Sequence, residues 1–157
     1  MEVIIRPIQE EELESVLHLN SLLFHKEIED YDPYLIVSRP YLDVWKEYFS
    51  SRMKEEKSLL LGAFVETTLI GYVAGSTYDA VSRRTVGDFV ELENMLVLDA
   101  YRNQWVGKKL VTSVFERCKV RWIGSMQVIA SAENKDAIRF YETCGCRQYA
   151  TTLEIIL

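Results

Sequence analysis

The hydrophobic pattern in the middle of the chain constrains the fold more than any other feature. Two strand-like runs, residues 59–66 and 69–78, flank the short polar break Thr67-Thr68, which is typical of a β-hairpin. A third strand-like run follows at residues 89–98. We therefore expect a β-sheet to form the centre of the protein.

Helical periodicity precedes and follows these strands. A strand over residues 3–7 leads into a helix from Leu13 to about Phe24, and Pro40 fits the first turn of an aromatic-rich second helix. Apolar residues step by four along a third helix, residues 107–121. A polar loop, a strand, a last helix and closing strands complete the expected elements, at residues 79–87, 126–130, 134–143 and 146–157.

Length and composition narrow the class of protein. The 157 residues, 48% hydrophobic and 27% charged, fit one globular domain over residues 1–157. Eighteen Lys and Arg against 24 Asp and Glu give a net charge of -6, which argues against nucleic acid as a partner. No apolar run approaches the roughly 20 residues of a membrane span, and the N-terminus does not resemble a secretory signal. We expect a cytoplasmic protein with no membrane partner.

The cysteines and histidines do not form a recognisable site. Cys118, Cys144 and Cys146 are odd in number, and the last two are too close in sequence for a comfortable disulfide. His18 and His25 lie far from them along the chain, so a metal ligand set is incomplete. We expect no metal ion and assign no cysteine nucleophile.

A strand followed by a basic turn and a helix, residues 90–110, is the most informative segment. The start of a helix leaves about four peptide N–H groups without intrahelical partners and carries positive partial charge. Arg102, Lys108 and Lys109 add full charges, so this turn suits a phosphate or pyrophosphate. By itself the pattern also fits an ordinary solvated connection.

Two spaced sets of residues give the segment a family resemblance: Val97, Tyr101, Arg102, Gly107, Lys108, Lys109 and Leu110, then Asn134, Ala137, Phe140, Tyr141 and Gly145. This arrangement resembles the GNAT superfamily of acyl-CoA-dependent N-acyltransferases. The expected element order, β-α-α-β-β-β-α-β-α-β, is similar as well. The resemblance implies an α+β fold, a single domain with a mixed sheet flanked by helices. It also implies acetyl-CoA as the acyl donor and transfer to a primary amine in a ternary complex.

The same resemblance implies the residues that hold the cofactor. The pyrophosphate would lie against the loop Arg102, Asn103, Gln104, Trp105, Val106, Gly107 and Lys108. The pantetheine arm would pair with the backbone of Met95, Leu96 and Val97. Asn134 caps the last helix and would contact the cofactor, while the Tyr141 phenol would bind there and protonate the departing thiolate.

Trp105 departs from the family pattern, which has glycine at this position. Glycine serves where a backbone approaches a ligand with no Cβ in the way. We expect Trp105 to keep helical φ and ψ with its indole directed away from the phosphates, which leaves the peptide N–H groups usable. The departure keeps two alternatives open, a non-catalytic acyl-CoA-binding module and a phosphate-binding fold without CoA chemistry.

Two glutamates are candidates for the general base. Glu91 and Glu93 lie two residues apart on the predicted strand and therefore on the same face. The resemblance matches both to acidic positions of the family, and either one would take the amine proton directly or through water. The alternative is that both only solvate the exposed face of the sheet.

The acceptor would contact the first two helices and the loop between them. Acidic and tyrosine side chains gather there: Glu27, Glu29, Asp30, Asp32, Tyr31, Tyr34 and Tyr41. Such a surface suits a small-molecule or peptide amine and fits a solvated acidic loop equally well. The sequence leaves open whether the chain forms a homodimer.

Overall fold

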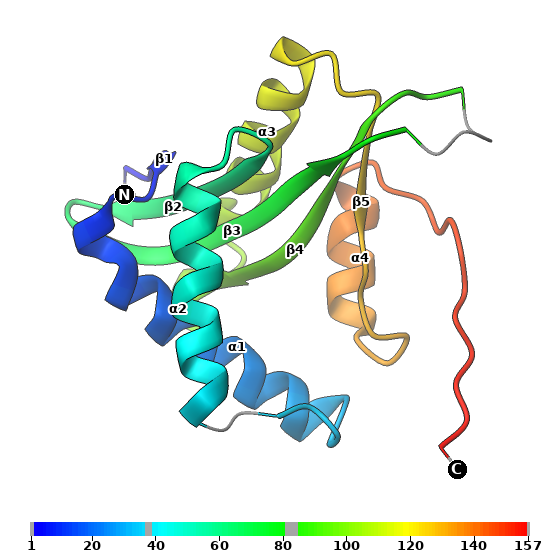
Figure 1. Ribbon diagram of the computed structural model, residues 1–157, viewed down its shortest axis with the longest axis horizontal. Helices are drawn as coiled ribbons and strands as arrows, with labels where there is room; N and C mark the ends of the chain where they lie inside the picture. Colours follow the sequence, from blue (N-terminus) through cyan, green and yellow to red (C-terminus); the bar gives the residue numbers. More distant parts are fainter. Residues whose placement is uncertain (1, 37–38, 81–84, 157) are drawn as a thin grey trace.

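A five-stranded sheet runs through the centre of the computed structural model, which describes residues 2–36, 39–80 and 85–156 (Figure 1). The strands lie in the order β1 to β5, at Ile4–Pro7, Ser58–Val65, Thr68–Tyr78, Phe89–Val97 and Ser125–Val128. The first four strands pair antiparallel with their neighbours, whereas β5 is parallel to β4. The sheet is therefore mixed, as expected.

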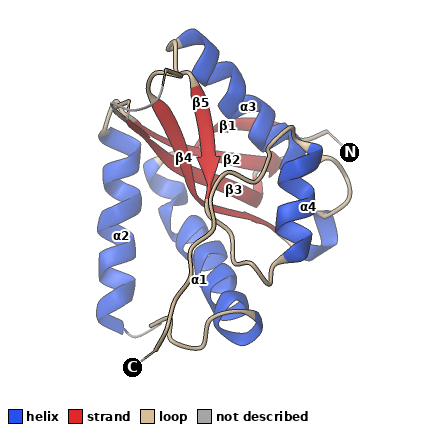
Figure 2. Cartoon of the chain, turned by 90° about the vertical axis from the view of Figure 1, so that its right-hand side faces the viewer, coloured by secondary structure: helices blue, strands red, loops and turns tan. Residues whose placement is uncertain are grey.

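Helices cover both faces of the sheet (Figure 2). α1 (Leu13–Asp30) and α2 (Arg39–Lys54) lie on one face, and α3 (Val106–Val120) and α4 (Lys135–Thr143) lie on the other. Two short 3-10 helices complete the elements, η1 (Glu10–Glu12) and η2 (Asp99–Tyr101). None of the helices in the described ranges has the length and apolar character needed to cross a membrane.

Each face has its own hydrophobic core. The four-residue step of Leu110, Val114 and Cys118 buries one side of α3 against β2, β3 and β4. On the opposite face, Phe49 of α2 packs edge-on against Tyr72 of β3, with ring centroids 5.8 Å apart. Each fully buried side chain of this size contributes about 1.5–3 kcal/mol to stability. The sheet is thus anchored from both sides, which fixes the position of β4 between the two cores.

β4 carries an irregularity that matters for the site. Ala74 of β3 pairs with Asn94, but the next residue, Gly75, pairs with Leu92, so Glu93 is the extra residue of a β-bulge. A Cβ on Gly75 would lie 2.3 Å from the Glu91 carbonyl oxygen, so only glycine fits this close approach. The bulge turns consecutive side chains of β4 toward α2.

The pairing of β4 with β5 stops early. The last paired residues are Leu92 and Val128, whereas β4 continues to Val97 in contact with β3 alone. The second half of β4 therefore has an edge that no strand among the described residues covers.

Most of the predicted elements are present. The hairpin is confirmed, with Glu66 and Thr67 between its strands, and the four helices lie where the periodicity indicates. The first helix is longer than expected and ends at Asp30, and its additional turns carry the partly buried Glu27 and Ile28. Within the expected loop 79–87, residues 81–84 lie outside the described ranges.

The expected closing strands are wrong for the described residues. Residues 146–156 form no strand, and Leu153 and Ile155 are 91% and 79% exposed. An apolar alternation becomes a strand only when a neighbouring strand supplies hydrogen-bond partners and a surface to cover. These residues have neither, so the observed fold ends at α4.

Candidate functional site

The loop between η2 and α3 contains a row of peptide N–H groups that are not paired within the helix. Asn103 and Trp105 both have positive φ, 58° and 67°, and α3 begins directly afterwards. The first hydrogen bond of the helix runs from the Lys109 N–H to the Trp105 carbonyl, at 2.9 Å. The peptide N–H groups of residues 103–108 have no acceptor within the described ranges. This arrangement suits an anion such as a pyrophosphate.

Trp105 has a different backbone conformation from the helical one that we expected. Its φ of 67° and ψ of 1° lie in the left-handed region, which glycine populates freely. The loop therefore has the backbone shape that glycine would give at this position. The indole is 70% exposed, and the Lys108 ammonium lies 5.3 Å from its ring centroid.

Two other residues of the motif have structural roles that their family resemblance does not reveal. The Arg102 guanidinium donates to the Val97 carbonyl at 3.0 Å and pairs with Asp99 at 2.8 Å, which ties the turn to the end of β4. A Cβ on Gly107 would lie 3.1 Å from the Phe140 ring, so glycine lets α3 approach α4 closely.

α4 supplies the predicted cap and the predicted tyrosine. The Asn134 side chain accepts a hydrogen bond from the Ala137 N–H at 3.0 Å, which confirms that Asn134 caps this helix. The Tyr141 hydroxyl donates to the Met95 Sδ at 3.7 Å. Burial raises the pKa of Tyr141, so its phenol stays protonated near neutral pH. A proton donor therefore lies beside the part of β4 that β5 leaves uncovered.

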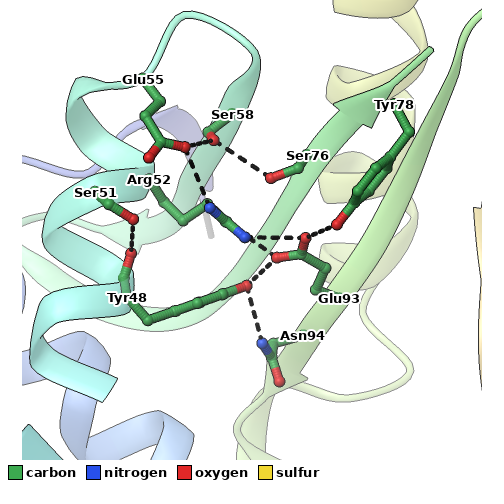
Figure 3. Close-up of polar contacts among 9 residues, drawn as sticks. All are labelled: Tyr48, Ser51, Arg52, Glu55, Ser58, Ser76, Tyr78, Glu93 and Asn94. Atoms are coloured by element: carbon green, nitrogen blue, oxygen red, sulfur yellow. Dashed lines mark hydrogen bonds and ion pairs between the residues drawn. The ribbon is translucent and has the colours of Figure 1, made fainter. Parts of the chain in front are cut away.

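Glu93 of β4 is held on the α2 face by donors from two elements, α2 and β3 (Figure 3). Arg52 of α2 donates through Nε to Oε2 and through Nη2 to Oε1, both at 3.1 Å. Tyr48 donates to Oε2, and Tyr78 of β3 donates to Oε1 at 2.9 Å. The Asn94 amide in turn donates to the Tyr48 hydroxyl at 3.2 Å. We call this group, Tyr48, Arg52, Tyr78, Glu93 and Asn94, the Glu93 cluster.

The Glu93 cluster is well shielded from water, because the side chains of Arg52 and Glu93 are only 16% and 13% exposed. Burial alone would raise the pKa of Glu93, but the hydrogen bonds from Arg52 and the tyrosines outweigh burial and leave the pKa below its usual value. With both oxygens occupied by charged or phenolic donors, this carboxylate is a poor proton acceptor.

Glu91 is in a different situation, although it lies near the same surface. The pKa of Tyr78 is raised by burial and then by both glutamates, which agrees with the prediction that Glu91 and Glu93 share a face. The Glu91 side chain makes no hydrogen bond or ion pair with the described part of the chain. Of the two candidate bases, Glu91 is the one with an uncommitted carboxylate.

Sequence reasoning missed the role of Tyr48, Arg52 and Tyr78. The aromatic face of α2 was visible, but no spacing links positions 41 and 45 residues apart to a glutamate on β4. Only the packing of α2 against the sheet brings these side chains together.

The acidic side chains at the end of α1 differ in their burial and in their hydrogen-bond partners. Lys26 pairs with Asp30 at 2.7 Å, and the Asp32 carboxylate accepts from the Tyr34 N–H at 3.0 Å. Burial and the nearby Asp32 raise the pKa of Glu27. The Tyr41 side chain lies outside the described part of the structure.

Comparison with known proteins agrees with this architecture. The Acetyltransferase (GNAT) family model matches residues 20–146. The fold is similar to a transcriptional regulator from Bacillus halodurans C-125, with a TM-score of 0.80 and 22% identity over 99% of this chain and 100% of that chain. It is also similar to the aminoglycoside N-acetyltransferase AAC(6')-Iy in complex with CoA, with a TM-score of 0.80 and 18% identity over 99% and 95% of the chains. The aminoglycoside antibiotic 6'-N-acetyltransferase AAC(6')-Ih from Acinetobacter baumannii gives 0.78 and 20%, over 99% and 98%. No curated protein matches the sequence significantly.

Proposed function

Because this chain belongs to the acetyltransferase (GNAT) family, we propose that it transfers an acetyl group from acetyl-CoA directly to a primary amine. Acetyl-CoA would supply the activated acyl group. The uncommitted N–H groups of residues 103–108 fit its pyrophosphate, and the uncovered edge of β4 at Met95, Leu96 and Val97 fits its pantetheine arm. The Asn134 side chain, besides capping α4, would contact the cofactor at the same side.

The observation that carries the proposal is the position of Tyr141. Its hydroxyl lies 3.7 Å from the sulfur of Met95, on the half of β4 that β5 leaves uncovered. In the proposed reaction the amine nitrogen bonds to the acetyl carbon and the carbon–sulfur bond breaks, while Tyr141 gives its proton to the departing sulfur. Burial that raises the pKa of the phenol also makes a nearby thiolate more basic, so the driving force for proton transfer is retained.

We assign the general base to Glu91. An attacking amine must lose a proton, and a base needs a free lone pair to accept it. Glu91 has that freedom, whereas the Glu93 carboxylate is filled by Arg52 and two phenols. Glu93 is instead proposed to hold α2 and Tyr48 in place beside the bulge.

The acceptor is proposed to be a small-molecule or peptide amine that approaches from the α1–α2 side. The positive charge of Arg52 neutralises the negative charge of Glu93 on this side. The Glu91 carboxylate therefore leaves a net negative charge on the surface beside the β-bulge of β4. A protonated amine is attracted to such a surface before it gives up its proton. Two of the similar structures are named as acetyltransferases of aminoglycosides, which are themselves polyamines, and this agrees with the charge.

Two measurements test the function. A thermal shift with CoA should raise the melting temperature, because a ligand that binds only the folded state stabilises it. Release of free thiol from acetyl-CoA in the presence of a panel of amines should then report turnover. Binding without thiol release for any amine would favour the non-catalytic acyl-CoA-binding module, and an unchanged melting temperature would exclude both.

A further inference from the structure

Residues 146–156 lie outside the sheet, although their sequence has the character of a strand. Tyr149, Thr151, Leu153 and Ile155 alternate with smaller or polar residues, and no glycine or proline interrupts residues 147–156. The Tyr149, Leu153 and Ile155 side chains are all exposed. In Figure 1 the segment leaves the body of the protein and runs clear of the sheet. One chain therefore carries a strand-like segment whose apolar side is uncovered.

The two edges of the sheet are protected to different degrees. The β1 edge carries Arg6 and Pro7, and the Lys109 ammonium donates to the Val3 carbonyl just before this strand, at 3.4 Å. Charged side chains and proline hinder the pairing of an edge strand with another chain. At the other edge, β5 pairs with β4 alone among the described residues, and residues 122–132 contain neither a charged residue nor a proline. The β5 edge is therefore open to a further strand.

Exposed apolar side chains lie at both ends of β5. Trp122, three residues before the strand, is 93% exposed, and Ile129, directly after it, is 81% exposed. Large apolar side chains gathered around an open strand edge mark a surface for interaction with another protein. The same chain thus has both an uncovered edge and an uncovered strand-like segment.

We propose that residues 149–156 of one chain add as a strand to the free edge of β5 in a second copy of this chain, which gives its own segment in exchange. Within a single chain the segment does not return to its own β5, although that edge is open. The backbone N–H and C=O groups of β5 gain partners, and Leu153 and Ile155 gain a surface to cover. Because the exchange is reciprocal, it closes as a two-fold dimer and leaves neither edge free.

The apolar area agrees with a stable dimer. Burial of a Leu or Ile side chain removes about 60–120 Å² from water, and an aromatic side chain removes more. Each copy would contribute five exposed side chains to the contact: Trp122, Ile129, Tyr149, Leu153 and Ile155. In both copies together these side chains bury on the order of 1,000 Å². With the backbone of the added strands, the contact reaches the roughly 1,200–2,000 Å² of specific interfaces.

The first test changes the apolar side of the segment. Sedimentation velocity of the unmodified protein at micromolar concentration should give a dimer, with twice the 18.3 kDa of one chain. Leu153→Asp should raise the dissociation constant of the dimer about 10²-fold or more, because the substitution acts twice in a two-fold interface. Leu153 is exposed in the single chain, so this variant should still fold.

The matched control is Thr152→Asp, which adds the same charge on the opposite side of the segment and should stay within about threefold of the original dissociation constant. Equal weakening by the two variants would overturn the proposal, because the alternation of a paired strand would then be missing. A protein that stays monomeric at every concentration would overturn it as well.

The second test changes the other partner, the β5 edge. Ile129→Lys places a charge beside this edge and should weaken the dimer at least tenfold. The control Ile4→Lys changes an exposed isoleucine of β1, at the opposite edge of the sheet, and should leave the dissociation constant unchanged. A dimer that resists Ile129→Lys, or one that only Ile4→Lys weakens, would place the interface elsewhere.

Hydrogen exchange identifies the partner of the segment. The peptide N–H groups of residues 149–156 should be protected when the unmodified protein is dimeric and should lose protection on dilution and in Leu153→Asp. Protection that persists in the monomer would show that the segment pairs with β5 of its own chain. A dimer with an unprotected segment would form through another surface. Either result would overturn the proposed exchange.

Discussion

The two faces of the sheet are built by different means. On the α3–α4 face, the candidate cofactor site consists mainly of backbone groups, the N–H groups of residues 103–108 and the uncovered edge of β4, with Asn134 and Tyr141 added from α4. On the α1–α2 face, the Glu93 cluster consists of side chains from α2, β3 and β4.

This difference has a consequence for function. Backbone groups at a helix start depend little on the neighbouring side chains, so we expect the candidate cofactor face to tolerate Trp105 in place of glycine. The Glu93 cluster depends on every member, because an unpaired buried charge is costly. We therefore expect substitutions on the α3–α4 face to affect chemistry or binding and those in the Glu93 cluster to affect stability and acceptor position.

The largest expected effect belongs to Tyr141→Phe, which removes only a hydroxyl. It should lower kcat by 10²-fold or more, the usual scale for a lost general acid, and leave CoA affinity nearly unchanged. Steady-state kinetics and a CoA titration would measure the two effects separately. Full activity at every pH, with chemistry limiting the rate, would remove Tyr141 from the mechanism.

Glu91→Gln should lower kcat by about 10²-fold, since a general base contributes roughly that much. The acidic limb of the pH–rate profile should change with it, because the base must be ionised to act. The matched variant Glu93→Gln should raise KM for the amine and leave the acidic limb in place. If Glu93→Gln alone moves that limb, the roles of the two glutamates are reversed.

Arg52→Met should lower the free energy of unfolding by about 2 kcal/mol, because it leaves the shielded Glu93 carboxylate without its charged donor. The control Lys46→Met breaks the exposed pair with Glu14 and should change stability by less than about 0.5 kcal/mol. Urea unfolding would compare the variants. Equal effects would mean that the Glu93 cluster does not hold α2 against the sheet.

The smallest expected effect is a pH dependence of stability. The pKa of Glu93 is lower in the folded state than in the unfolded chain, so its ionised form stabilises the fold above the unfolded value of about 4.3. That contribution is lost as the pH falls through the lower folded pKa. The stability difference between the unmodified protein and Glu93→Gln, about 1 kcal/mol at pH 7, should shrink toward zero once the pH falls below the folded-state pKa of Glu93. A difference that persists there would assign the effect to packing.

The sequence predictions that succeeded depend on contacts between residues close together in the chain, and those that failed depend on contacts with distant residues. The hairpin, the four helices and the Asn134 cap were predictable, because each reflects contacts within a few residues. The closing strands were not, since residues 146–156 have the apolar alternation of a strand but no neighbour to pair with. The Trp105 conformation was also missed, because the loop geometry overrides the ordinary backbone preference of the residue.

By itself, the sequence determined the family and the order of helices and strands up to α4, and it predicted a segment that would hold a pyrophosphate. These depend on local periodicity and on residue types at fixed spacing. Tertiary structure alone decided that Glu93 is bound by Arg52, Tyr48 and Tyr78 while Glu91 is left uncommitted. It also decided that the Trp105 indole borders a groove with β1. The physical reason is that hydrogen bonds and burial depend on which side chains meet in space, and these partners lie far apart in the chain, 45 residues for Tyr48 and Glu93.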